Sequence, residues 1–246
     1  MSSPRPFALS IAGSDPSGGA GLLADIKTFE ANKVYGLGVT TAVTIQNENE
    51  FKSVQWLSSD EIIKQIEIIT KKYKIGLAKI GLIENLETLI KISELLSPNS
   101  LLIWDPILKA SAGFEFHKKI ETEKLEMALK NIFLVTPNSE EAIALTGIKD
   151  PLKAAEKLSM HCNVLLKGGH SEHVKGRDFL FTREKKHYSF RPGKNMVFPK
   201  HGSGCVLSAA ITANLSKGFN LHAACLRAKS YTEKFLSSNA MLLGYH

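Results

Sequence analysis

The stretch of sequence that decides the fold covers residues 7–32 and reads FALSIAGSDPSGGAGLLADIKTFEAN. Its opening run, residues 7–12, is mostly apolar, as expected of a strand that is buried on both faces. A loop with four glycines follows at residues 13–21, and residues 21–32 have the period of a helix. A buried strand, a glycine loop and a helix in this order predict the first unit of a parallel α/β sheet.

The same alternation continues along the chain. Further apolar runs predict strands at residues 38–46, 77–83, 101–108, 133–136 and 163–167. Segments of helical period are found at residues 60–73, 85–96, 123–131, 140–145, 151–161 and 221–237. Two short runs, residues 178–183 and 186–191, predict an antiparallel hairpin at the sheet edge. We therefore expect one doubly wound α/β domain over residues 1–246, with a frayed tail at residues 1–6.

The composition excludes several classes of protein. With 43% hydrophobic and 22% charged residues in 246, the chain is neither disordered nor fibrous, and three cysteines do not make a disulfide framework. No run approaches the ~20 apolar residues of a membrane span, and we expect a cytoplasmic protein. The net charge of +7 raises the question of nucleic acid, but the lysines are scattered and no aromatic-interleaved basic stripe occurs. A nucleic-acid partner is therefore not expected.

The first glycine loop, residues 13–21, lies where ligands of open α/β sheets bind, at the carboxyl end of a strand. Its spacing matches neither a Walker A loop nor a dinucleotide-binding loop. The glycines permit a close backbone approach to a ligand. A tight turn between strand and helix is the alternative interpretation.

The second glycine loop, His201-Gly-Ser-Gly-Cys205, precedes a predicted helix at residues 206–215. The amides of Gly202, Ser203 and Gly204 should converge at the helix N-terminus and form an anion site. Cys205 would lie in the first helical turn, where we expect a lowered thiol pKa. The alternative is a capped helix with a small buried thiol.

Polar residues follow three further strands. Asn138 and Glu141 stand three apart on an opening helix and point the same way, so they could hold a hydrated Mg²⁺ near phosphates. A capping box made by the same pair is the alternative. Lys167, in Lys167-Gly-Gly-His170, places a cation at the same sheet edge, and Asp105-Pro106 ends another strand.

Taken in order, these motifs resemble those of the hydroxymethylpyrimidine/phosphomethylpyrimidine kinases of thiamine biosynthesis, a branch of the ribokinase-like superfamily. The resembling stretches are residues 11–29, 41–47, 79–81, 105–106, 136–138 with Glu141, 167–170 and 201–205. The first glycine loop and the second, with its cysteine, are the specific ones, since most sugar and nucleoside kinases of the superfamily carry Asp where this chain has Cys205. The resemblance implies a three-layer αβα sandwich with a mostly parallel sheet, and it is compatible with a homodimer.

The resemblance also implies a reaction, the ATP- and Mg²⁺-dependent phosphorylation of 4-amino-5-hydroxymethyl-2-methylpyrimidine and of its monophosphate. Cys205 would be the general base or would orient the hydroxyl, and the amides of residues 202–204 would stabilise charge on the transferred phosphoryl group. Asn138 and Glu141 would organise Mg²⁺ through water, with Lys167 and Asn138 near the nucleotide. The residues that match the family's pyrimidine site are Gly13, Ala20, Asp25, Gln46, Leu82 and Ile107. The Gln46 amide offers an aminopyrimidine both a donor and an acceptor.

The chain departs from the family pattern at four places. Ser203 replaces the usual threonine, and Leu82 replaces a common methionine. Ser111 stands where the family has a lysine, which Lys109 could substitute. Residues 198–200 differ from the usual Asn-Thr pair, which leaves the lip on the nucleotide side unassigned.

Two other functions remain open. Pyridoxal also carries a hydroxymethyl group on a nitrogen aromatic ring, and relatives of this family phosphorylate it. A non-catalytic sensor that binds the pyrimidine is the other alternative, although the chain retains Cys205 and its glycine loop.

Overall fold

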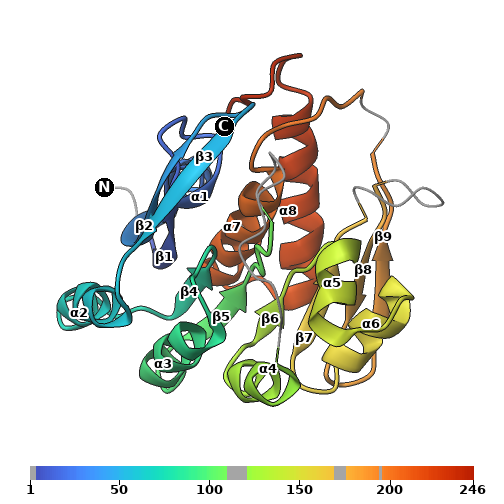
Figure 1. Cartoon of the computed structure of the whole chain (residues 1–246). Coiled ribbons are helices and arrows are strands. Elements are labelled where there is room, and N and C mark those ends of the chain that lie inside the picture. The colour runs from blue at the N-terminus through green and yellow to red at the C-terminus, as the bar shows by residue number, and fades with distance from the viewer. Residues whose placement is uncertain (1–3, 110–120, 169–175, 194–195) are drawn as a thin grey trace.

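The strands pair into one mixed sheet, seen in a computed structural model that describes residues 4–109, 121–168, 176–193 and 196–246 (Figure 1). Within these residues the strand order is β3-β2-β1-β4-β5-β6-β7-β8-β9. The strands are β1 (Phe7–Ser14), β2 (Tyr35–Gln46), β3 (Phe51–Trp56), β4 (Leu77–Ile80), β5 (Leu101–Trp104), β6 (Leu134–Val135), β7 (Asn163–Leu166), β8 (Asp178–Phe181) and β9 (His187–Phe190). The helices are α1 (Gly21–Ala31), α2 (Ser59–Thr70), α3 (Leu86–Leu96), α4 (Thr122–Leu129), α5 (Ser139–Thr146), α6 (Pro151–Leu158), α7 (Ser203–Ser216) and α8 (Leu221–Leu236).

The central strands β2, β1, β4, β5, β6 and β7 run parallel; β3 pairs antiparallel with β2 at one edge, and β8 pairs antiparallel with both β7 and β9 at the other. Strand β1 has β2 on one side and β4 on the other, so the direction of winding changes there. Ligands of doubly wound sheets bind at the carboxyl ends of strands near such a switch point. The predicted mostly parallel sheet with its β8–β9 hairpin is confirmed.

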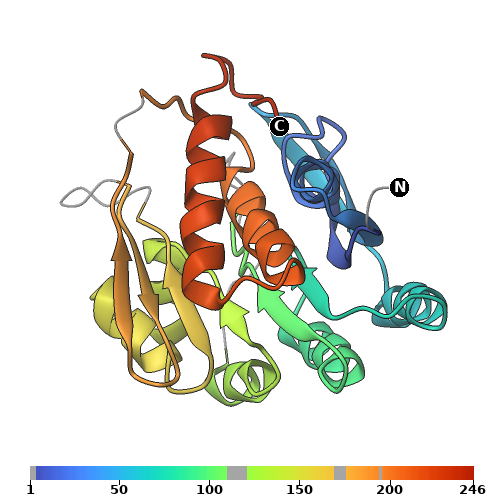
Figure 2. The same ribbon diagram turned by 180° about the vertical axis from the view of Figure 1, so that it is seen from behind.

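Helices cover both faces of the sheet. One buried cluster joins the sheet to α2–α6 through residues such as Ile66, Leu89 and Leu125. Two others join the opposite face to α1, α7 and α8, with Phe29 and Ile211 among them. Figure 2 shows α7 and α8 in front of the strands from this second side. This is the expected αβα sandwich, and it explains why central strands such as β1 are apolar on both faces.

The main differences from the prediction are two shortened strands, whose predicted ends carried expected site residues, and one strand that was missed. Strands β4 and β5 end at Ile80 and Trp104, so Leu82 and Ile107 lie in the loops beyond them. The apolar pattern continued there because those loops are themselves largely buried. Strand β3 pairs with β2 at the sheet edge, and its three polar residues are exposed, which interrupts the apolar pattern that marks a buried strand.

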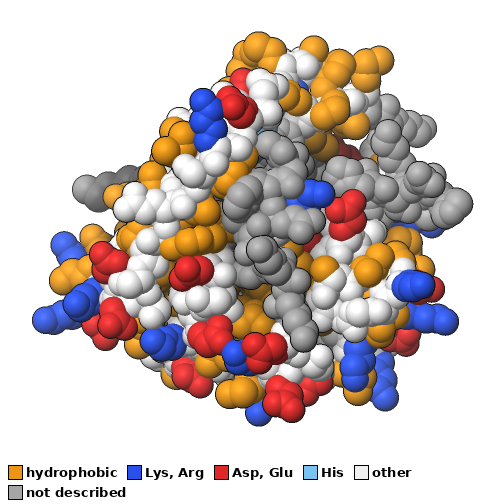
Figure 3. Space-filling model, in the orientation of Figure 1, with side chains coloured by type: hydrophobic (Ala, Val, Ile, Leu, Met, Phe, Trp, Pro, Cys, Tyr) orange, Lys and Arg blue, Asp and Glu red, His pale blue; other side chains and the backbone are white. Residues whose placement is uncertain are grey.

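The surface carries both signs of charge. Figure 3 shows Lys and Arg side chains interspersed with Asp and Glu over the lower part of this face. Among the described residues, no helix has both the length and the apolar character that crossing a bilayer requires.

Candidate active site

The two glycine loops, far apart in sequence, meet at the carboxyl end of β1. Gly202 has a φ of 71°, and a Cβ there would lie 2.1 Å from the carbonyl oxygen of Gly19 and 2.7 Å from Cα of Ala20. Gly21 has a φ of 59°, and a Cβ there would lie 2.2 Å from the carbonyl oxygen of Gly13. Both positions therefore require glycine for conformation and for space.

The second glycine loop forms the start of α7. Gly202 is the N-cap, and no side chain of the described residues caps the helix. Free amides at the N-terminus of a 14-residue helix favour an anion. A Cβ on Gly204 would lie 3.4 Å from Nζ of Lys167, so a cation stands beside these amides. The predicted placement of a basic side chain at this edge is confirmed.

Gly202→Ala is expected to lower kcat/KM by roughly tenfold or more, because the backbone of one loop would have to move away from the other. Gly218→Ala is the matched control. Gly218 follows the opposite end of α7, has a φ of 86°, and has open space where a Cβ would be. Both variants strain the backbone by placing alanine at a positive φ, but only Gly202→Ala also creates a clash. Steady-state kinetics and urea unfolding of both variants separate these two effects. Equal kcat/KM in the two variants would contradict this packing argument.

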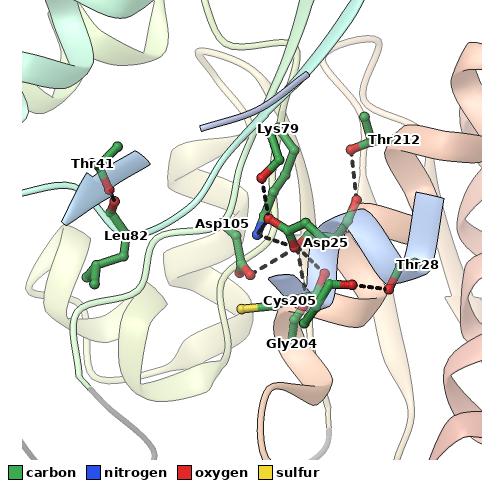
Figure 4. Close-up of polar contacts among 12 residues, drawn as sticks. Asp25, Thr28, Thr41, Lys79, Leu82, Asp105, Gly204, Cys205 and Thr212 are labelled. Atoms are coloured by element: carbon green, nitrogen blue, oxygen red, sulfur yellow. Dashed lines mark hydrogen bonds and ion pairs between the residues drawn. The ribbon is translucent and has the colours of Figure 1, made fainter. Parts of the chain in front are cut away.

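Cys205 is buried beside charged groups rather than in hydrocarbon (Figure 4). Burial raises the pKa of its thiol to about 11; the charge of Lys79 opposes this rise, and those of Asp25 and Asp105 add to it. The predicted lowering of this pKa is therefore wrong. A backbone hydrogen bond from Gly21 lowers the pKa, but not enough to offset the loss of water around the thiolate.

A fully buried ion pair lies next to Cys205. Nζ of Lys79 lies 2.8 and 2.7 Å from the two carboxylate oxygens of Asp25, and the Ser10 hydroxyl donates to the same carboxylate at 2.6 Å. Although burial disfavours its charge, the carboxylate of Asp25 holds the pKa of Lys79 above its usual value. Sequence reasoning named Asp25 for the pyrimidine but gave Lys79 no role. A lysine inside the apolar strand β4 was the available signal, since a buried lysine needs a partner.

A second charged cluster surrounds Asp105, directly after β5. Nζ of Lys167 lies 2.8 Å from Oδ1 of Asp105 and 3.4 Å from Glu141. The hydroxyls of Thr136 and Ser208 donate to Asp105 at 3.1 and 3.0 Å. Asp105 therefore orients Lys167 toward the start of α7 and joins four elements at one edge.

Asn138 and Glu141 form the capping box of α5. The amide of Glu141 donates to Asn138 Oδ1 at 2.8 Å, and the amide of Asn138 donates to Glu141 Oε2 at 2.7 Å. Within the described residues, no three His, Cys, Asp or Glu side chains are placed to hold a metal together. Mg²⁺ keeps several waters and binds one or two carboxylates plus substrate phosphates. The structure thus forms the capping box that was the alternative interpretation of this pair, and the binding of a hydrated Mg²⁺ by Glu141 stays a prediction.

Four of the residues expected to bind the pyrimidine lie around the first glycine loop and the ends of β2 and β4. A Cβ on Gly13 would lie 2.9 Å from Cδ2 of Leu82, and the carbonyl of Leu82 accepts a hydrogen bond from Thr41 (Figure 4). Ala20 precedes α1 and touches the second glycine loop, and Gln46 is the last residue of β2. Asp25 belongs to the buried pair, with both oxygens bonded.

Ile107 lines a cavity of about 230 Å³ at the carboxyl ends of β4 and β5, beside α3 and α4. Its described lining is Gly81, Ile83, Asn85, Leu86, Glu87, Trp104, Ile107, Leu108, Glu121 and Lys124. None of these lining residues belongs to a glycine loop, so this cavity does not join Ile107 to Cys205. Ser111 and His170 lie outside the described residues. At the lip formed by residues 198–200, Lys200 donates to the carbonyls of Asn239 and Met241.

Comparison with known proteins gives consistent matches. A family model described as phosphomethylpyrimidine kinase matches residues 15–246. The hydroxymethylpyrimidine/phosphomethylpyrimidine kinase of Haemophilus influenzae is 32% identical over 243 residues, which cover 93% of this chain and 90% of that protein. A solved phosphomethylpyrimidine kinase from Clostridium difficile 630 has a TM-score of 0.78 at 32% identity, covering 93% and 98%. The pyridoxal kinase of Staphylococcus aureus, in complex with AMP-PCP and pyridoxal, has a TM-score of 0.82 at 28% identity, covering 95% and 88%.

The fold and the site thus define a kinase with a ribokinase-like architecture. The chain belongs to the phosphomethylpyrimidine kinase family, whose model spans all but its first 14 residues. The predicted family, fold class and kinase activity are confirmed, and phosphorylation of the hydroxymethylpyrimidine and its phosphate is the activity named for its relatives. The roles of single residues stay predictions.

Proposed function

We propose that this protein transfers the γ-phosphoryl group of ATP to the hydroxymethyl oxygen of 4-amino-5-hydroxymethyl-2-methylpyrimidine, and then a second phosphoryl group to the monophosphate, in thiamine biosynthesis. One observation carries the proposal. The N-terminus of α7, which no described side chain caps, lies together with the Cys205 thiol and Lys167 at the sheet edge where the first glycine loop ends. Phosphoryl transfer depends on positioning and charge neutralisation, which these groups supply.

The phosphates of the nucleotide would lie against the amides of residues 202–204. Those amides donate toward the equatorial oxygens, where negative charge develops as the bond to the leaving ADP breaks. Lys167, held by Asp105 at 2.8 Å, would add a fixed positive charge beside them. Mg²⁺, held by Glu141 through water, would neutralise the phosphates further.

Cys205 would serve as the general base for the attacking hydroxyl. The hydroxymethyl oxygen forms the new bond to phosphorus, ADP leaves, and the hydroxyl proton passes to the sulfur. With a pKa of about 11, only about one thiol in 10⁴ is ionised at pH 7. The charge of Lys79, which opposes the effect of burial, would therefore support activity.

A substrate panel with identification of the products by mass tests the proposal. Incubation with ATP and Mg²⁺ should give the phosphorylated pyrimidine and then the diphosphate, with a higher kcat/KM than pyridoxal. Gln46→Leu should reduce kcat/KM for the aminopyrimidine more than for pyridoxal, because the lost amide pairs with the amino-substituted ring edge. Gln55→Leu, an exposed position on β3, is the matched control. No phosphorylated pyrimidine would contradict the proposal.

Pyridoxal is the second candidate substrate. The observation that favours it is the TM-score of 0.82 to a pyridoxal kinase in complex with pyridoxal. A higher kcat/KM for pyridoxal than for the pyrimidine in the same panel would make vitamin B6 salvage the main activity.

A further inference from the structure

A buried hydrogen bond between Asp15 and His201 joins the two glycine loops. Nε2 of His201 lies 2.8 Å from Oδ2 of Asp15, and the two side chains are 5% and 1% exposed. The residues are 186 positions apart in sequence, so the bond connects the start of the chain to the start of α7. Neither side chain has a role in the transfer step described above.

Asp15 organises the first glycine loop. Its carboxylate accepts hydrogen bonds from the Ser17 amide at 2.9 Å, the Ser17 hydroxyl at 2.9 Å and the Ala20 amide at 3.0 Å. Although burial disfavours its charge, hydrogen bonds from His201 and Ser17 hold the pKa of Asp15 below its usual value. Ala20 is expected to contact the pyrimidine. A displacement of Ala20 would therefore move the Asp15 carboxylate, which also holds His201.

His201 is the first residue of the second glycine loop, and its hydrogen bond ties this loop to Asp15. A carboxylate only accepts hydrogen bonds, so Nε2 of His201 carries the proton and donates it. The ring's other nitrogen, Nδ1, is buried and has no hydrogen-bond partner among the described residues. The orientation of the ring thus depends on Asp15, and the next residue, Gly202, begins the anion-binding turn.

The backbones of the two loops are also in contact. A Cβ on Gly19 would lie 2.7 Å from Cδ2 of His201, and a Cβ on Gly202 would lie 2.1 Å from the oxygen of Gly19. Neither loop has room to approach the other without moving it. The hydrogen bond opposes the other movement, in which the loops separate.

From this geometry we propose that the Asp15–His201 hydrogen bond couples the two binding steps, so that the pyrimidine and the nucleotide each raise the affinity for the other. The inference rests on the proposed function. Asp15 and His201 are positioning residues here: each acts through its loop. By thermodynamic linkage the increase must be the same in both directions. We expect about tenfold, within the usual range of such couplings.

Calorimetric titration measures the coupling directly. The dissociation constant of AMP-PCP with Mg²⁺ is determined with and without saturating 4-amino-5-hydroxymethyl-2-methylpyrimidine. In the unaltered protein the pyrimidine should tighten AMP-PCP binding about tenfold. In His201→Phe, which keeps a ring but has no N–H donor, the ratio should fall to within about twofold of one. His201→Gln, which restores a donor, should recover much of the coupling.

Control variants separate the loss of coupling between the two ligands from a general loss of folded structure. His222, an exposed residue of α8 whose ring packs against those of Tyr188 and Phe190, is changed to Phe as the histidine control outside the glycine loops and should keep the full ratio. Should His201→Phe fail to fold by circular dichroism, His201→Leu carries the test. A ratio unchanged in the variant without the donor, or a ratio of one in the unaltered protein, overturns the inference and leaves the proposed function standing. Absence of pyrimidine binding in the unaltered protein overturns both.

Discussion

Replacing Cys205 by alanine is expected to lower kcat by about 10²–10⁴-fold, the range observed when a general base is removed. The sulfur lies in the first turn of α7 and can accept a proton, and the three amides before it remain in the variant. Substrate binding should therefore change less than kcat. Steady-state kinetics with the pyrimidine and ATP measure both quantities.

The pH dependence of the same reaction follows from the raised thiol pKa. A base is active when deprotonated, and the pKa of Cys205 is about 11, so kcat/KM should increase with pH through the neutral and mildly alkaline range. The increase should approach tenfold per pH unit well below pH 11. A flat profile that accompanies the loss in Cys205→Ala would assign the thiol to orienting the hydroxyl.

Two other buried cysteines provide matched controls for this prediction. Cys162→Ala and Cys225→Ala remove the same atom from comparably buried places away from the glycine loops. Both should lose some stability from the cavity and keep kcat within about threefold. Unchanged turnover in Cys205→Ala would remove the proposed base.

Lys79→Met is expected to lower the free energy of unfolding by about 3–5 kcal/mol, because it leaves Asp25 as an uncompensated charge in a fully buried place. Urea denaturation followed by circular dichroism measures this loss. The same change removes the positive charge that opposes the rise in the Cys205 pKa. Iodoacetamide should therefore alkylate Cys205 more slowly at a given pH, measured in a background where Cys162 and Cys225 are alanine.

A double variant and a surface variant test the cause of that loss. Adding Asp25→Asn to Lys79→Met removes the buried charge and keeps an acceptor for Ser10, so it should restore a large part of the stability. Lys124→Met breaks exposed pairs with Glu87 and Glu121 and should change stability little. A double variant no more stable than Lys79→Met alone would contradict the ion-pair explanation.

Local patterns predicted most of the fold. The strand, glycine loop and helix at residues 7–32 appear as β1 and α1, and the hairpin appears as β8 and β9. Buried parallel strands must be apolar on both faces, and that requirement is visible in the sequence. Strand β3 was missed in the sequence because its pairing with β2 leaves Lys52, Ser53 and Gln55 in solvent, where no apolar pattern is needed.

The two glycine loops were also visible in the sequence, because positive φ angles and close backbone contacts at Gly21 and Gly202 can be met only by glycine. The helix that begins after Gly202, with the loop amides at its N-terminus, was predicted for the same local reason. The order of the motifs along the chain then identified the family that the comparisons confirm.

The electrostatic character of the site depended on contacts between distant segments. Lys79 meets Asp25 from 54 residues away, Lys167 meets Asp105 from 62, and His201 meets Asp15 from 186. The pKa of Cys205 is raised, whereas its place at a helix N-terminus predicted a lowered value. The helix N-terminus is visible in the neighbouring residues of the sequence, but the burial that raises the pKa comes from all the segments packed around the thiol. Residue types and their spacing encode which groups are present. Only the folding of α1, β4 and α7 against one another removes the water between those groups, and the lost water decides which of them carry charge.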